Sequence, residues 1–220
     1  MSETAGHNLN KLKSQISDSV TLVAVSKTKP NEAIMSAYDT GHRVFGENKV
    51  QEMTRKWDAL PPDIQWHMIG HLQTNKVKYI APYVALIHSL DRLKLAKEIN
   101  KQAGRNSRII DCLIQIKIAR EDEKFGFSPQ EALSFLEGLT ANPLPHLRVT
   151  GVMGMATFTS DMAQIKEEFS ILKSFYDQHK SQYNLEILSM GMSGDYPIAL
   201  ELGSNMIRVG SAIFGPRQAH

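Results

Sequence analysis

The chain has 220 residues, of which 42% are hydrophobic and 22% are charged. These proportions are ordinary for a globular domain and exclude an intrinsically disordered chain. Lysines and arginines nearly balance acidic residues, 25 against 23, so the basic surface typical of a nucleic-acid-binding protein is missing. No apolar stretch reaches the length of a membrane span. We therefore expect neither nucleic acid nor a membrane among the partners.

The compartment follows from two further observations. The single cysteine, Cys112, cannot form an internal disulfide, which favours a reducing environment. Residues 1–10 are polar and lack the apolar core of a secretory signal peptide. We expect the protein to be cytoplasmic.

Short apolar runs alternate with amphipathic stretches along the whole sequence. Most of the runs are rich in Val, Ile, Leu or Met, which is typical of parallel strands buried on both faces. There are eight such runs, at residues 21–27, 43–46, 65–70, 84–89, 111–118, 149–155, 185–190 and 206–214. Together with the intervening helices they predict an α/β fold with a parallel sheet. A closed (β/α)₈ barrel and an open doubly wound sheet both fit this alternation.

Helical signals lie between the runs. Leu9, Leu12 and Ile16 predict an extra helix before the first strand. Ser128 and Glu131 form a capping-box pattern around Pro129 at the start of a later helix. The other expected helices cover about 34–41, 91–104, 162–176 and 196–202. No linker or low-complexity segment interrupts this order, so we expect residues 1–220 to form a single domain.

Polar and glycine-rich residues gather at the C-terminal ends of the predicted strands. In a (β/α)₈ barrel these ends meet at one rim, where barrel active sites are built. The residues include Lys27 in the first run, Asn48 after the second, His71 after the third, Ser193 after the seventh, and Gly210 and Ser211 within the eighth. The spacing therefore predicts one site at that rim.

Lys27 is the sharpest candidate for chemistry. Strand alternation places it on the same face as Val23 and Val25. If that face lines the barrel, partial desolvation leaves more neutral amine to attack a carbonyl group. The ordinary interpretation is a strand-end lysine that reaches solvent or a carboxylate, and spacing alone favours it.

Two loops near the C-terminus suggest a phosphate site. Residues 189–195 are small and precede a short predicted helix, and Gly210 and Ser211 allow a second close backbone approach. Loops after the seventh and eighth strands are the usual phosphate site of this barrel. A strand-end lysine beside a phosphate pocket is the pair of features that pyridoxal 5′-phosphate (PLP) requires. Ordinary tight turns are the alternative.

Arg208 shares a predicted strand face with Met206 and Gly210, so it faces the barrel mouth. Because arginine stays protonated, it could donate a hydrogen bond to an unprotonated pyridine nitrogen. The alternative is a salt bridge to Glu201 or Asp195. His67 and His71 are four residues apart, but no carboxylate or cysteine cluster completes a metal site, so we expect no metal.

Six segments give the chain a resemblance to a known family. They are VAVSK at 23–27, FGEN at 45–48, WHMIG at 66–70, LQTNK at 72–76, SMGMS at 189–193 and RVGSAIFG at 208–215. In this order they resemble the pyridoxal phosphate homeostasis protein family, a single-domain relative of the alanine racemase N-terminal barrel. The resemblance covers about residues 22–215.

The resemblance implies a (β/α)₈ barrel and a set of PLP-binding residues. It implies that Lys27 holds PLP as a Schiff base and that Arg208 lies near the pyridine nitrogen. The implied phosphate-binding residues are Ser193, Gly210 and Ser211, and the implied further neighbours of the cofactor are Asn48, His71 and Met190.

The function implied is homeostasis of intracellular PLP and of amino and keto acids, without a robust catalysed reaction. The chain ends five residues after Gly215, so we expect no additional domain to supply the second base of a racemase. The alternatives are a PLP-dependent amino-acid racemase-like enzyme and a cofactor-free Schiff-base aldolase. The partners expected are PLP and either PLP-dependent apo-enzymes or a regulatory protein, and the chain is expected to be a monomer.

Overall fold

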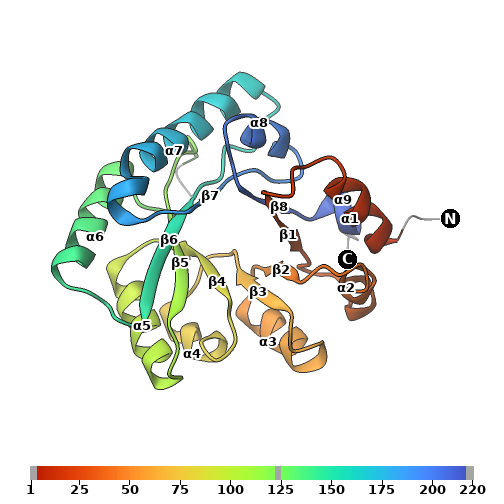
Figure 1. Ribbon diagram of the computed structural model, residues 1–220, viewed down its shortest axis with the longest axis horizontal. Helices are drawn as coiled ribbons and strands as arrows, with labels where there is room; N and C mark the ends of the chain where they lie inside the picture. Colours follow the sequence, from red (N-terminus) through yellow and green to blue (C-terminus); the bar gives the residue numbers. More distant parts are fainter. Residues whose placement is uncertain (1–3, 122–124, 217–220) are drawn as a thin grey trace.

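Eight parallel strands close into a barrel in chain order, with helices arranged around it (Figure 1). The structure is a computed structural model that describes residues 4–121 and 125–216. The strands are β1 (Thr21–Val25), β2 (Val44–Glu47), β3 (Gln65–Met68), β4 (Leu86–Leu90), β5 (Ile110–Gln115), β6 (Leu147–Met153), β7 (Ile187–Ser189) and β8 (Met206–Val209). Each pairs with the next, and β8 pairs with β1. The (β/α)₈ barrel is confirmed, and the open sheet is wrong.

The helices follow the strands and one precedes them. They are α1 (Ala5–Lys13), α2 (Asn31–Tyr38), α3 (Val50–Ala59), α4 (Val77–Ile80) after the 3₁₀ turn η1 (Thr74–Lys76), α5 (Leu93–Arg105), α6 (Pro129–Ala141), α7 (Met162–Tyr183), α8 (Tyr196–Glu201) and α9 (Ser211–Phe214). The extra N-terminal helix α1 packs beside α2 and α9 (Figure 1). Gly6 N donates to Ser36 Oγ at 3.1 Å, and Asn8 Nδ2 donates to Ile213 O at 3.0 Å. The first bond joins α1 to α2, and the second joins α1 to the last helix of the described chain, α9.

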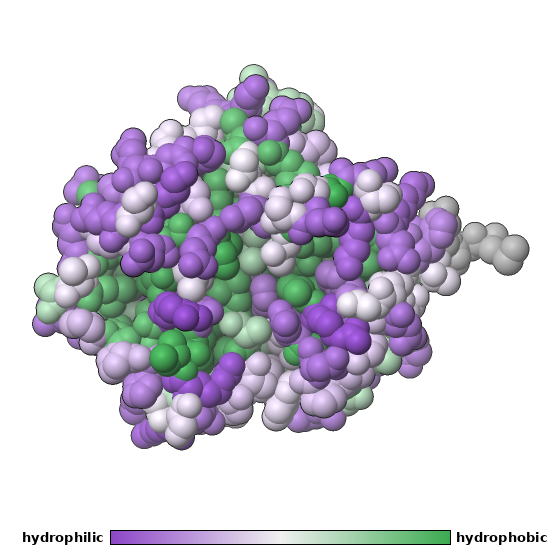
Figure 2. Space-filling view, in the orientation of Figure 1, coloured by the Kyte–Doolittle hydropathy of each residue, from purple (hydrophilic) through white to green (hydrophobic). Residues whose placement is uncertain are grey.

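The strand side chains alternate between two apolar layers. The barrel interior holds a small cluster of Val23, Leu86, Leu113, Met153 and Met206. The alternate positions, such as Ala24, Phe45 and Trp66, belong to the larger layer between the strands and the helices. On the face shown in Figure 2, apolar residues lie toward the middle of the molecule and polar residues surround them. Burial of the strands on both faces explains why their sequences read as continuous apolar runs.

Local sequence signals set several element boundaries. Helix α6 begins at the predicted capping box, in which Ser128 Oγ accepts from Glu131 N and the Glu131 carboxylate accepts from Ser128 N. In β6, a Cβ at Gly151 would lie 2.0 Å from Ile187 O, so only glycine allows β7 to approach this closely. Within residues 4–121 and 125–216, no helix combines the length and apolar character needed to cross a membrane.

Several strands end earlier than predicted, and the early ends of β8 and β1 bear on the predicted site residues. The run at 206–214 is strand only as far as Val209, because Gly210 takes a helical backbone conformation and its carbonyl accepts from the N–H groups of Ile213 and Phe214. Gly210 and Ser211 therefore lie at the start of α9 and not within a strand. Likewise β1 ends at Val25, so Lys27 lies in the turn that follows it.

Candidate functional site

A cavity of about 800 Å³ lies at the C-terminal ends of the strands. Its walls come from the segments that follow β1, β2, β3, β5, β6, β7 and β8. Seven of the eight predicted site residues line it: Lys27, Asn48, His71, Ser193, Arg208, Gly210 and Ser211. The structure therefore brings together residues that are up to 184 positions apart in the sequence, Lys27 and Ser211 being the extremes.

Lys27 occupies a tight turn. Residues 26–29, the Lys27 turn, are closed by a hydrogen bond from Lys29 N to Ser26 O at 3.0 Å, and Thr28 has a φ of +65°. Lys29 Nζ donates to the carbonyls of Phe214, Gly215 and Pro216 at 2.9, 3.1 and 2.9 Å. Lys29 thereby ties this turn to the end of α9, where carbonyls without helical partners attract a cation.

A buried charged cluster lies against the Lys27 turn. Lys56 of α3 has a side chain only 7% exposed, and its Nζ lies 2.7 Å from Oε1 of both Glu47 and Glu52. The same ammonium donates to Ser26 O at 2.8 Å, while Ser26 Oγ donates to Glu47 Oε1 at 2.6 Å. Burial raises the pKa of Glu47 above its usual value, although Lys56 and Ser26 oppose that shift. We call Glu47, Glu52 and Lys56 the Lys56 cluster.

Arg208 lies in β8, the strand paired with β1, and has a different environment from this cluster. It is 3% exposed, and it donates through Nη1 to Ser189 Oγ at 2.6 Å and through Nη2 to Gly154 O at 3.0 Å. Both of these acceptors are uncharged, and the Asp195 carboxylate favours the charged form of Arg208 through its electrostatic attraction. Burial lowers the pKa of Arg208 to about 10, and it still carries a proton at neutral pH.

A chain of neutral hydrogen bonds continues from Arg208 through the barrel. His88 Nδ1 lies 3.4 Å from Ser189 Oγ, and His88 Nε2 lies 3.0 Å from His67 Nδ1. Burial lowers the pKa of His67 to about 3 and that of His88 well below its usual value, so both rings are neutral. Because a guanidinium only donates, Ser189 Oγ accepts from Arg208, and each neutral ring offers one donor and one acceptor nitrogen to its neighbours in the chain. We call these four residues the Arg208 chain.

The loop after β7 folds back onto β8 and forms part of the cavity wall. Gly191 has a φ of +98°, and its carbonyl accepts from Arg208 N at 3.0 Å. Ser193 Oγ accepts from Gly210 N at 3.2 Å, which joins the two predicted phosphate-binding segments. Asp195 Oδ1 accepts from Met192 N and closes the loop. A side chain at Gly194 would meet nothing within 4 Å, so the loop leaves open space at the cavity wall.

Asn48 and His71 line the cavity on the side of β2 and β3. Asn48 Oδ1 is buried and has no hydrogen-bond partner. His71 Nδ1 lies 3.1 Å from Asp91 Oδ2, and its ring stacks on Phe125 at 3.8 Å between centroids. Among the described residues, no group of three or more His, Cys, Asp or Glu side chains is arranged to bind a metal ion.

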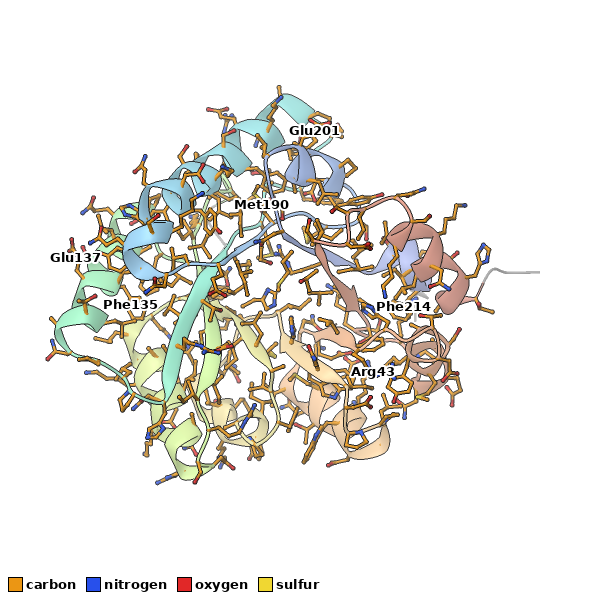
Figure 3. All side chains as sticks on the ribbon, in the orientation of Figure 1. Arg43, Phe135, Glu137, Met190, Glu201 and Phe214 are labelled. Carbon is orange, nitrogen blue, oxygen red and sulfur yellow. The ribbon has the colours of Figure 1, made fainter. Side chains whose placement is uncertain are left out.

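Met190 does not line the cavity. It is fully buried in the layer between the strands and the helices, where Figure 3 shows it between β7 and helices α7 and α8. Several other residues that line the cavity were not predicted from the sequence. They are chiefly apolar and come from the segments after β3, β5 and β6 and from α7: Ile69, Phe125, Met155, Phe158 and Ile165. Their apolar character gave no signal that separated them from the core.

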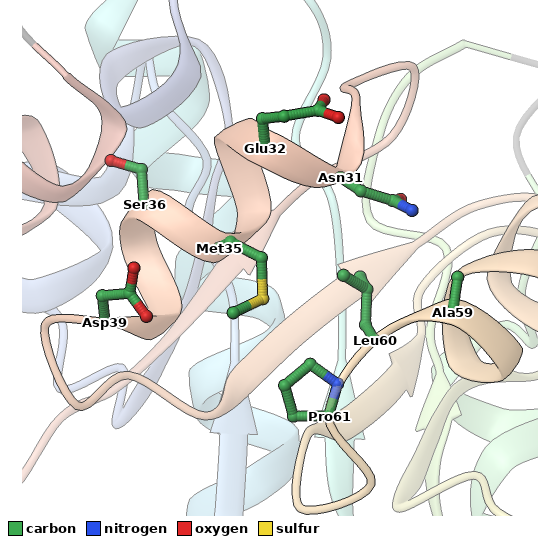
Figure 4. A pocket seen from close by; sticks show the side chains of 8 residues that line it. All are labelled: Asn31, Glu32, Met35, Ser36, Asp39, Ala59, Leu60 and Pro61. Atoms are coloured by element: carbon green, nitrogen blue, oxygen red, sulfur yellow. The ribbon is translucent and has the colours of Figure 1, made fainter.

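A second hollow of about 810 Å³ lies on the outer surface between α2 and the end of α3 (Figure 4). Met35, Leu60 and Pro61 form its apolar part, and Glu32 and Asp39 lie at its edge. It brings together neither a nucleophile with a base nor a cluster of cations. The cavity at the barrel mouth is therefore the candidate site.

Comparison with known proteins defines the class first. The family model described as "Alanine racemase, N-terminal domain" matches residues 3–218. An alanine racemase from Clostridium difficile 630 has the same fold, with a TM-score of 0.78 over 98% of this chain and 56% of that chain at 16% identity. This chain is a barrel of that class.

Closer relatives then define the family. The chain is 40% identical over 200 residues to the pyridoxal phosphate homeostasis protein of Aquifex aeolicus, covering 90% of this chain and 87% of that protein. It is 37% identical to the human protein of that name, over 89% of this chain and 76% of that one. PipY of Synechococcus elongatus, solved with PLP bound, has a TM-score of 0.86 at 34% identity over 96% of this chain and all of that one. The chain belongs to the pyridoxal phosphate homeostasis protein family.

Proposed function

We propose that this chain binds PLP in the cavity at the barrel mouth, holds it as a Schiff base on Lys27, and acts in PLP homeostasis without a robust catalysed reaction. The observation that carries the proposal is the placement of Lys27 and a buried, protonated Arg208 in one cavity. The names of the curated relatives and the PLP bound by PipY support the same ligand.

The polar groups of the cavity fit PLP. Arg208 uses Nη1 and Nη2 for protein acceptors, and a guanidinium has five N–H donors, so donor capacity remains for a ligand. Ser193, Gly194 and Gly210 form a small-residue wall suited to the close approach of a phosphate group. Asn48 Oδ1 is a buried acceptor without a partner, which a ligand donor would satisfy. When bound, PLP supplies an aldehyde that combines reversibly with an amine.

The chemistry of Arg208 favours a carrier over an enzyme. With a pKa of about 10, lowered by burial, Arg208 remains a donor near neutral pH. A group that only donates pairs with an unprotonated ring nitrogen, and a ring in that state withdraws electrons weakly. The two histidines behind Arg208 are neutral and cannot supply the missing proton. The site therefore suits storage and release of PLP.

The test is to load the purified protein with PLP, remove the excess, reduce it with borohydride and locate the modified lysine by peptide mass mapping. Mapping is needed because Lys29 lines the same cavity as Lys27. We expect a visible absorption band before reduction and the adduct on Lys27. Lys27→Ala removes that adduct, and Lys49→Ala, a change at an exposed lysine outside the cavity, leaves it intact.

Absence of the band in the parent protein would overturn the proposal and favour the cofactor-free Schiff-base aldolase. An adduct on another lysine would overturn the role of Lys27 alone. The carrier interpretation has its own test, because the loaded protein is expected to leave L-alanine unracemised over hours. Steady racemisation that is lost in Lys27→Ala would favour the racemase-like enzyme.

A further inference from the structure

The conformation of the Lys27 turn needs support from outside the turn. Thr28 stands at the third position with a φ of +65°, where a type II turn usually has glycine. A β-branched residue rarely takes this left-handed conformation. Such a residue persists only where its surroundings hold it.

The Lys56 cluster provides that support on both sides of Lys27. Before it, Ser26 O accepts from Lys56 Nζ at 2.8 Å and Ser26 Oγ donates to Glu47 at 2.6 Å. After it, Thr28 N donates to Glu52 Oε1 at 2.6 Å. The three N–H donors of Lys56 match three acceptors, Ser26 O and the two carboxylates. All three N–H donors of the Lys56 ammonium are thus occupied, and they join α3 and the end of β2 to the turn.

Burying charges is unfavourable, and closing the turn does not require it. Glycine at position 28 would take the left-handed conformation without outside support. The chain has instead a threonine whose conformation depends on two buried charged groups, Glu47 and Lys56, and on the partly exposed Glu52. Such an arrangement fixes the direction of the side chain that the turn carries, and that side chain is Lys27.

We propose that Lys56, with Glu47 and Glu52, is a positioning residue that holds the Lys27 amine in the orientation required to combine with PLP. This inference rests on the proposed function. In the reaction the Lys27 nitrogen forms a C=N bond with the aldehyde carbon, and its two protons leave with the carbonyl oxygen as one water molecule. Lys56 exchanges no proton in this step and acts only through the turn.

The first measurement is the rate of appearance of the absorption band after PLP is mixed with apo protein. Lys56→Met keeps an unbranched side chain one atom shorter than lysine and removes its charge, and we expect the rate to fall by about 10-fold or more, as it does when reacting groups are misplaced. Adding Thr28→Gly is expected to restore most of the rate, because glycine holds the turn without Lys56. Lys49→Met, at an exposed lysine directly before the same helix, is the matched control and keeps the parent rate.

Two results of this measurement overturn the inference. One is a parent-like rate in Lys56→Met. The other is a slow rate that Thr28→Gly does not restore, because a purely structural loss is not repaired at the turn. If Lys56→Met does not fold, Glu52→Ala replaces it, since this carboxylate is partly exposed and its loss leaves the Lys56–Glu47 pair. A rate about 3- to 10-fold lower is then expected, again restored by Thr28→Gly, and an unchanged rate overturns the inference.

Hydrogen exchange of the apo protein separates this inference from the proposed function. In Lys56→Met or Glu52→Ala, peptides covering 26–29 are expected to exchange faster, while those covering β8 keep their protection. If the parent protein forms no band, the proposed function fails. Faster exchange at 26–29 in the variants would still show that the Lys56 cluster stabilises the turn. Unchanged exchange at 26–29 overturns the inference whatever the outcome with PLP.

Discussion

Two buried cations lie near the cavity, and their hydrogen-bond partners differ. Lys56 is surrounded by two carboxylates and a carbonyl, which together take all of its donors. Arg208 has a serine hydroxyl and a carbonyl, and behind these lie two neutral histidines. The first cation is satisfied within the protein, whereas the second keeps both its charge and part of its donor capacity for the cavity. We propose that this difference separates a group that holds the site in shape, Lys56, from one that contacts the ligand, Arg208.

The largest expected effect is on stability, and it contrasts the two cations directly. Lys56→Met leaves Glu47 and Glu52 without their cation, and breaking a buried pair costs about 3–5 kcal/mol, toward the low end here because Glu52 is partly exposed. Arg208→Met removes a buried charge whose two hydrogen-bond partners, Ser189 Oγ and Gly154 O, are uncharged, so relief of the buried charge offsets the two lost hydrogen bonds and a cost of about 1 kcal/mol is expected. Urea denaturation of both apo variants measures the free energy of unfolding. Equal losses of unfolding free energy in Lys56→Met and Arg208→Met would contradict the contrast between the two cations.

The effect on PLP affinity is expected to be direct for Arg208, although its effect on stability is the smaller of the two. Arg208→Met should weaken PLP binding about 10- to 100-fold, since hydrogen bonds to a charged group contribute about 1.5–3 kcal/mol. Equilibrium titration of the absorption band measures this in a variant that remains folded. Retention of parent affinity would show that Arg208 does not contact the ligand.

The sequence predicted one of these two regions and not the other. Arg208 was predicted because it falls on an inward-facing strand position near the predicted rim, where a charged group requires a partner. Lys56 was missed because Glu52 and Lys56 form an i,i+4 pair of a kind that usually lies on an exposed helix face. A signal did exist, since Val50, Met53 and Lys56 share the buried face of α3. Helix α3 itself was not predicted, and so this signal was not used.

Several of the remaining errors concern the ends of elements. The eight strands and the rim follow from alternation and burial, which are properties of short sequence windows. The switch from strand to helix at Gly210 and the turn at Thr28 depend on hydrogen bonds to distant segments, such as Ser193 and Glu52. Apolar residues of the cavity wall, such as Met155, are likewise indistinguishable from core residues until the fold is closed.

A pH dependence is expected from Glu47. Burial raises its pKa in the folded protein above the usual value of 4.5, so in the interval between these two values the folded protein binds more protons than the unfolded chain. The contribution of this group to stability is therefore greatest below the unfolded value and falls as pH rises through the interval. Urea denaturation across this interval should show that the free energy of unfolding declines less with rising pH in Glu47→Gln than in the parent. A parallel decline would show that Glu47 is ionised equally in both states.

The smallest expected effect tests the chain behind Arg208. Ser189→Ala removes the acceptor of Arg208 Nη1, and the arginine is then held by Gly154 O alone. A loss of about 1 kcal/mol, or about 5- to 10-fold in PLP affinity, is expected because one buried hydrogen bond is lost. Ser89→Ala is the matched control, since Ser89 is also a fully buried strand serine but its Oγ has no partner. Equal effects of the two substitutions would mean that Ser189 contributes only packing, and the orientation of Arg208 would then rest on the backbone of β8 and on Gly154.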